Sequence, residues 1–259
     1  MMEKLIAELM RLFVQDHPDA PELLARRLQG EDVETMDLLS SAGLTRAVAI
    51  PFEKVKDAAE GEHWKQLCEA ANTLQADHGF PAPAVSVTGL GYCLWISLAA
   101  PVPNAQARQF VRRVRQAWLP ASAARGEVKM PPLPPCLDVR SGHWAAFIHP
   151  GMGASFADEP WLEVPPPALA QAAFLESVQS VSAVCFADAF AALGPVEAPA
   201  PSAAPARAST STPAQATPPS SPPPAQDGLL LKDATLEDII RHLHALNIEP
   251  TFRHLIQPN

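Results

Sequence analysis

Apolar side chains recur at helical spacing through the first 44 residues. Residues three and four apart lie on one side of an α-helix, so this spacing predicts a helix with one buried face. Its apolar residues are Leu5, Leu9, Leu12 and Phe13. A second helix is expected to begin near Pro21 with Asp19 as its N-cap and to end before Gly30. A third short helix is predicted over residues 33–42.

From residue 45 onward, short apolar runs typical of β-strands alternate with amphipathic stretches. Residues 46–50 form the first run, and Pro51 is expected to close it because proline cannot donate to a strand ladder. Two strands, 84–87 and 94–98, are joined by a glycine-containing loop, and a further strand is predicted over 144–148. The Pro-rich stretch 119–136 is expected to be irregular. Helices are predicted over 63–78, 104–118, 171–178 and 183–193.

The composition changes abruptly near residue 196. Residues 196–227 consist almost entirely of Pro, Ala, Ser, Thr and Gln, which cannot bury enough apolar surface to offset the entropy lost on ordering. A helical tail is expected over 228–259, and its helix at 235–246 is a candidate contact for a protein partner. The predicted fold is therefore α+β. It has a helical N-terminal region (1–44) packed on a mixed-sheet core domain (45–195), then a disordered linker and the tail.

Hydropathy, cysteine usage and net charge indicate where the protein is expected to be located and whether it binds nucleic acid. No apolar run reaches the ~18–20 residues that span a bilayer, and the first residues lack the features of a signal peptide. The four scattered cysteines suit buried thiols in a reducing cytosol, so a cytoplasmic protein without membrane contact is expected. The formal net charge of −9 argues weakly against nucleic-acid binding, although local patches decide such binding.

Two segments are candidates for anion binding. Thr88, Gly89 and Gly91 form a loop whose backbone amides suit a phosphate, although such a loop is most often only a hairpin turn. The helix 104–118 is expected to carry Arg108, Arg112 and Arg115 on one flank, where they suit a phosphate backbone. The alternative for these arginines is an ordinary solvated helix face.

Metal chemistry finds little support in the residue spacing. Cys136, Asp138, His143 and His149 do not follow a zinc-finger arrangement, so no metal site is predicted. The sequence also lacks the hydrolase, zinc-protease and kinase signatures.

The order of several segments resembles the archaeo-eukaryotic primase superfamily over residues 45–180. The segments are AVAIPFEK at 47–54, PAVSVTGLGYCLWI at 83–96, PVPNAQAR at 101–108, WAAFIHP at 144–150, SFADE at 155–159 and QAAFL at 171–175. The pattern is closest to the primase-like domain of TOTE-type conflict elements and to related primase-polymerases. This resemblance implies an RRM-like core within the domain.

The resemblance also implies where catalytic residues would lie, and the sequence departs from the family there. Two metal-binding aspartates of the family correspond here to Pro51 and Glu53. The family's nucleotide-contacting histidine, at the end of its glycine loop, is replaced by Cys93. A third acidic residue is expected further on, at Asp138 or Glu127. Because proline offers no metal ligand and Mg²⁺ requires hard oxygen ligands, these positions are degenerate.

Three functions follow as hypotheses. The first is a catalytically inactive primase-like protein that binds single-stranded DNA or RNA, or a replication or mobile-element partner, without a cofactor. The second is an active DNA primase-polymerase whose rearranged site uses Glu53 and Asp138 with Mg²⁺ or Mn²⁺. The third is a protein-interaction adaptor without nucleic-acid binding, which recruits a partner through its linker and tail helix.

Overall fold

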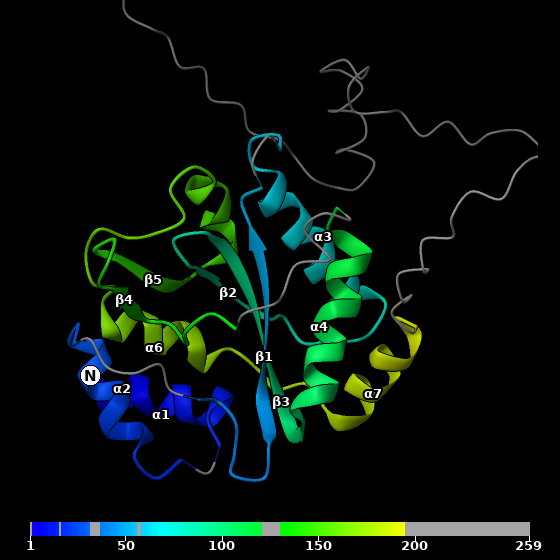
Figure 1. Ribbon diagram of the computed structural model, residues 1–259, viewed down its shortest axis with the longest axis horizontal. Helices are drawn as coiled ribbons and strands as arrows, with labels where there is room; N and C mark the ends of the chain where they lie inside the picture. The colour runs from blue at the N-terminus through cyan, green and yellow to red at the C-terminus, as the bar shows by residue number, and fades with distance from the viewer. Residues whose placement is uncertain (1, 16, 32–36, 56–57, 121–129, 195–259) are drawn as a thin grey trace, which may run out of the picture. The chain divides into compact units, whose positions relative to one another are not determined.

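A five-stranded antiparallel sheet in the order β1-β3-β2-β5-β4 forms the centre of the fold (Figure 1). The strands are β1 (Leu44–Glu53), β2 (Ala84–Val87), β3 (Gly91–Pro103), β4 (Cys136–Asp138) and β5 (His143–Ile148). The computed structural model describes residues 2–15, 17–31, 37–55, 58–120 and 130–194, which all belong to one compact unit. The predicted linker (196–227), the tail (228–259) and its helix at 235–246 lie outside these residues.

The structure confirms an α+β fold and corrects the expectation of a mixed sheet. Every pairing between the named strands is antiparallel, and the parallel contact that the described residues make is an isolated bridge between Leu98 and Val181. Short connections at 88–90 and 139–142 reverse the chain between paired strands. A reversal of this length allows only antiparallel neighbours, since a parallel pair requires a long crossover.

Strand β1 is longer than its sequence pattern predicts, because it continues through Pro51 to Glu53. The prediction that Pro51 ends the strand is therefore wrong. β1 is an edge strand and needs hydrogen bonds on only one side, so a residue without an N–H is tolerated within it. β1, β2 and β3 lie side by side in one sheet.

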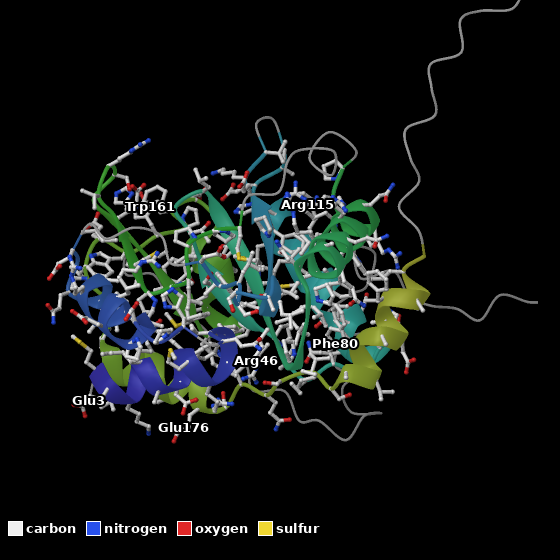
Figure 2. All side chains as sticks on the ribbon, turned by 60° about the horizontal axis from the view of Figure 1, so that its bottom comes forward. Glu3, Arg46, Phe80, Arg115, Trp161 and Glu176 are labelled. Atoms are coloured by element: carbon white, nitrogen blue, oxygen red, sulfur yellow. The ribbon has the colours of Figure 1, made fainter. Side chains whose placement is uncertain are left out.

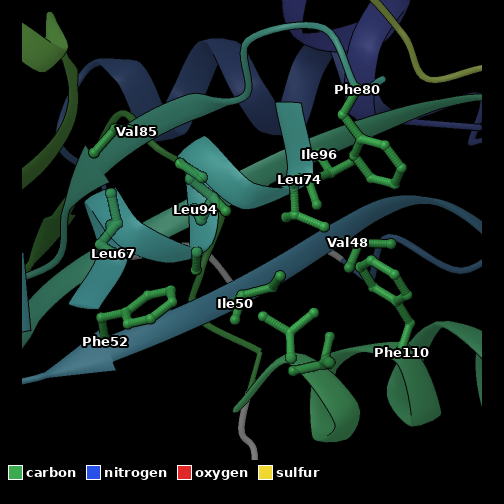
Figure 3. Close-up of a cluster of buried hydrophobic side chains, with 14 of the residues drawn as sticks. Val48, Ile50, Phe52, Leu67, Leu74, Phe80, Val85, Leu94, Ile96 and Phe110 are labelled. Carbon is green, nitrogen blue, oxygen red and sulfur yellow. The ribbon is translucent and has the colours of Figure 1, made fainter. Parts of the chain in front are cut away.

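One face of the sheet packs against α3 (Glu62–Ala76), α4 (Asn104–Trp118) and α7 (Ala183–Ala192). Side chains alternate between the two faces of a strand, so every second residue of β1 contributes to this core. Val48, Ile50 and Phe52 point into it, and each is fully buried (Figure 3). The three helices agree with their predicted ranges to within one or two residues.

The opposite face is covered by α1 (Met2–Phe13), α2 (Ala20–Leu28) and α6 (Ala168–Glu176). The four apolar residues predicted to form the buried face of α1 are all fully buried. The Phe13 ring stacks on Phe147 with centroids 5.9 Å apart and meets Trp95 edge-on at 5.5 Å. The N-terminal helices therefore share one core with the sheet.

Two local predictions differ from the structure. Residues 37–42 contain no helix, and Leu39 instead bridges Thr45; the rest of the helix predicted over 33–42, residues 33–36, lies outside the described residues. The stretch predicted to be irregular up to residue 136 ends in β4, whose short strand is held by its pairing with β5. A 3-10 helix over Pro150–Phe156, for which no prediction was made, follows β5.

Among the described residues, no helix has the length and apolar character needed to cross a membrane.

Candidate functional site

Pro51, one of the two positions that the resemblance aligns with metal ligands, lies inside the hydrophobic core, whereas the other, Glu53, is exposed. Pro51 of β1 is directly opposite Cys93 of β3, so the two side chains share one face of the sheet. That face is covered by α1 and α6, and Cys93 is fully buried beside Ala49 and Trp95. Burial raises the pKa of the Cys93 thiol well above its ordinary value, which keeps it neutral. Neither residue can provide the anionic oxygen that Mg²⁺ binds.

Glu53 and Asp138, the acids of the active alternative, are not brought together. Glu53 ends β1 and Asp138 ends β4, and these are the two edge strands of the sheet. Four steps of about 4.8 Å between neighbouring strands separate them by about 19 Å along the sheet. They also line different cavities. Glu127 lies outside the described residues.

Local hydrogen bonds within the turn after β4 account for the lowered pKa of Asp138. Its carboxylate accepts from the N–H of Arg140 at 3.1 Å and from the hydroxyl of Ser141 at 3.0 Å. These bonds, the backbone one first, lower the pKa of Asp138. The carboxylate thus closes the turn between β4 and β5.

In the part of the chain that the structure describes, no three His, Cys, Asp or Glu residues are grouped so that they could hold a metal.

The glycine loop is a tight hairpin turn whose polar groups have partners. The N–H and hydroxyl of Thr88 both donate to the carbonyl of Gly91, at 3.0 and 3.1 Å. The N–H of Gly89 donates to the carbonyl of Pro160 at 2.8 Å. A side chain at Gly91 would overlap the carbonyl oxygen of Phe52, so the approach of β1 requires glycine there. These contacts occupy the amides of Thr88 and Gly89 that a phosphate would use.

A cavity of about 370 Å³ lies at the end of the sheet where β2 and β4 finish. Among its lining residues are Thr88, Gly89, Cys136 and Asp138, which the sequence analysis singled out. The turn after β4 and the start of β5 add Arg140 and His143. The ring of His143 stacks on Trp161, with centroids 4.5 Å apart and planes 5° from parallel.

Arg27 also lines this cavity, and the sequence analysis missed it. It lies on the buried face of α2 with Ala20 and Leu24, and only 7% of its surface is exposed. The missed signal is the helical spacing of these three residues, which places Arg27 at a core-facing position. Arg26 and Arg27 together suggest ordinary basic residues at a helix C-terminus, where the helix dipole favours them.

The arginines of α4 do not share one solvated flank as predicted. Arg108 and Arg112 are exposed, whereas Arg115 is buried, with 8% of its surface exposed. Arg115 follows Val111 by four residues and so lies on the helix face that packs on the sheet. Burial lowers the pKa of its guanidinium, and the carboxylate of Glu53 opposes that shift. Arg113 packs its guanidinium 3.9 Å from the centre of the Phe190 ring.

The cavity beside β4 and the exposed arginines of α4 are separate regions. Figure 2 shows Trp161, next to the cavity, and Arg115, on α4, in well-separated parts of the molecule. A ligand bound in the cavity would therefore not be one that the α4 arginines hold directly.

No protein-family model matches the sequence, and a search of curated proteins finds no match.

Proposed function

We propose that this protein is a catalytically inactive, primase-like protein that binds single-stranded nucleic acid. One observation carries the proposal: Pro51 and Cys93, at the positions of the family's metal-binding and nucleotide-contacting residues, form a buried pair in the sheet. The adjacency of β1, β3 and β2 around that pair supports the proposed primase-like scaffold. The lack of anionic oxygen ligands at Pro51 and Cys93 supports the proposed inactivity.

The chemical reason for inactivity is the absence of suitable ligands at the reacting position. Metal-assisted nucleotidyl transfer requires ions that bridge and neutralise the phosphate oxygens. A proline, a neutral thiol and the single exposed carboxylate of Glu53 do not form such a site. Because Asp138 lies on the opposite edge strand, it does not complete the set.

Binding is expected to involve the exposed side of α4. Arg108 and Arg112 lie one turn apart, and neither forms an ion pair or hydrogen bond with another described residue. Both guanidinium groups are therefore available for phosphates, with little cost of breaking existing contacts. A replication or mobile-element protein partner is a further expectation, which the described residues do not address.

Salt-dependent binding to fluorescently labelled single-stranded DNA and RNA tests the proposal. Each phosphate contact contributes about 0.7 to the slope of log affinity against log salt for single strands, so Arg108→Ala/Arg112→Ala should flatten the slope by about one to one and a half. Lys4→Ala/Lys65→Ala is the matched control, because it removes two exposed positive charges from α1 and α3. This control should keep the parent slope.

Two results would contradict the proposal. If the parent protein binds neither nucleic acid at low salt, the adaptor hypothesis replaces it. If the α4 variant binds with the parent affinity and slope, the exposed arginines are only a solvated surface.

A further inference from the structure

Arg27 is a buried cation without a matching anion. Its Nη1 atom is buried and has no hydrogen-bond partner, and its guanidinium forms no ion pair with any described residue. Taking a guanidinium out of water is unfavourable unless hydrogen bonds or an opposite charge compensate it. A buried cation that lines a cavity therefore points to an anionic ligand.

The acidic groups nearby are already engaged. Glu31, on the cavity wall, pairs with the Nε of Arg26 at 2.8 Å. Asp138 accepts from the turn after β4. Cys136 forms a side-chain hydrogen bond with Arg27, but burial raises the pKa of its thiol despite the opposing charge and hydrogen bond of that guanidinium. The thiol is therefore neutral near pH 7 and supplies no counter-charge.

We infer that this cavity binds a phosphate-type oxyanion, with Arg27 as its principal ligand. The guanidinium fork matches two oxygens of such an anion. Arg140 and His143, from the other wall, can donate further hydrogen bonds, whereas the Thr88 hydroxyl and the Gly89 amide are occupied. Donors that come from separate elements suit a tetrahedral anion better than a planar carboxylate.

The dimensions of the cavity indicate a phosphate carried by a larger group. A volume of about 370 Å³ falls within the range of small-molecule sites and exceeds the need of one inorganic anion. The stacked pair of His143 and Trp161 presents aromatic surface beside the cavity, as a nucleobase would require. The ligand class is therefore a phosphate monoester, such as a nucleotide or the terminal phosphate of an oligonucleotide.

This site does not depend on the proposed function. Arg27 belongs to α2 and lies outside residues 45–180, which carry the family resemblance. The cavity is also separate from the α4 surface that is expected to hold a nucleic-acid strand.

Titration calorimetry with inorganic phosphate tests the inference at constant ionic strength, with chloride as the competing anion. Arg27→Met removes the charge and keeps an apolar side chain of similar length. Loss of a charged hydrogen bond should weaken phosphate binding about tenfold to a hundredfold. Lys65→Met, on the exposed side of α3, removes one positive charge away from the cavity and should bind phosphate like the parent.

Thermal unfolding gives a second readout. Phosphate should raise the melting temperature of the parent but not that of Arg27→Met. Without phosphate, Arg27→Met should melt at or above the parent temperature, because the variant no longer buries an unpaired charge. Arg140→Met, whose residue is exposed, leaves the core intact and should weaken phosphate binding less than Arg27→Met does. Lack of saturable phosphate binding by the parent, or equal binding by Arg27→Met, would overturn the inference.

Further ligands distinguish this inference from the proposed function. A nucleoside monophosphate, and an oligonucleotide with and without a 5′-phosphate, separate free phosphate from a nucleotide phosphate as the ligand. If phosphate binds but no oligonucleotide does, the oxyanion site stands and the proposed function fails. If oligonucleotides bind through α4 and phosphate does not bind, the oxyanion site is wrong and the proposed function stands.

Discussion

Replacing Cys93 with histidine, the residue that the primase resemblance would place there, should damage the fold and should not create a nucleotide site. Cys93 is fully buried on β3, opposite Pro51 and next to Trp95 in the core that α1 covers. Cys93→His replaces one sulfur atom with a five-membered ring. The ring has no space to enter the core without moving its neighbours, and no water reaches its nitrogens there.

The expected cost has two parts. Overpacking a filled core costs about 1–3 kcal/mol, and a buried polar group without a partner costs about 1–3 kcal/mol more. The sum is about 2–6 kcal/mol, a large fraction of the 5–15 kcal/mol that stabilises a typical domain. For a folded region of this size, the melting temperature should fall by about 4–24 °C. Cys93→Ala, which only removes the sulfur, should cost about 1 kcal/mol.

Urea unfolding followed by tryptophan fluorescence measures both variants, since Trp95 and Trp144 are buried. Nucleotide binding is measured in parallel. If Cys93→His unfolds at the same urea concentration as the parent, position 93 does not face a filled core. If the same variant also gains nucleotide binding, the site is open, and the reasoning for a catalytically inactive protein is refuted.

Three further predictions concern the same end of the sheet. Gly91→Ala should destabilise the protein by about 1–3 kcal/mol because a side chain there would overlap β1. Gly89→Ala has open space around it and should cost about 1 kcal/mol because of its positive φ. Equal urea midpoints for the two variants would contradict this prediction. Burial lowers the pKa of His63, whose Nε2 has no hydrogen-bond partner. The unfolded chain therefore binds a proton at higher pH than the folded chain does, so the free energy of unfolding should fall as pH drops below about 6.5. His63→Phe should reduce the slope of the free energy of unfolding against pH, measured from unfolding curves at pH 5–7.5. An unchanged slope would assign the pH dependence to other groups. Finally, no template-dependent nucleotide incorporation is expected with Mg²⁺ or Mn²⁺; incorporation that is lost in Glu53→Ala would instead support the active alternative.

Burial of the charged candidates was the least predictable property. The spacing of Arg108, Arg112 and Arg115 placed them close together on α4, yet the sheet covers one side of that group and leaves the other exposed. Arg27 was not singled out from the sequence at all, although it is buried and lines the cavity beside β4. In both helices the periodicity defines which residues share a face. It does not define how wide the covered face is, since that depends on the neighbouring elements.

Local patterns were enough for several of the helices and strands. The helical spacing of apolar residues predicted α3, α4 and α7, and the apolar runs predicted β2 and β5, because these signals depend on neighbours in the sequence. Strand order depends on pairing between distant segments, which no local pattern contains. Only the tertiary structure therefore placed Pro51 within an edge strand, buried Cys93 opposite it, and put Glu53 and Asp138 on opposite edges of the sheet. The sequence alone showed that Pro51 and Cys93 offer no anionic oxygen for a metal, whereas the packing of distant segments decided that both are buried in the core.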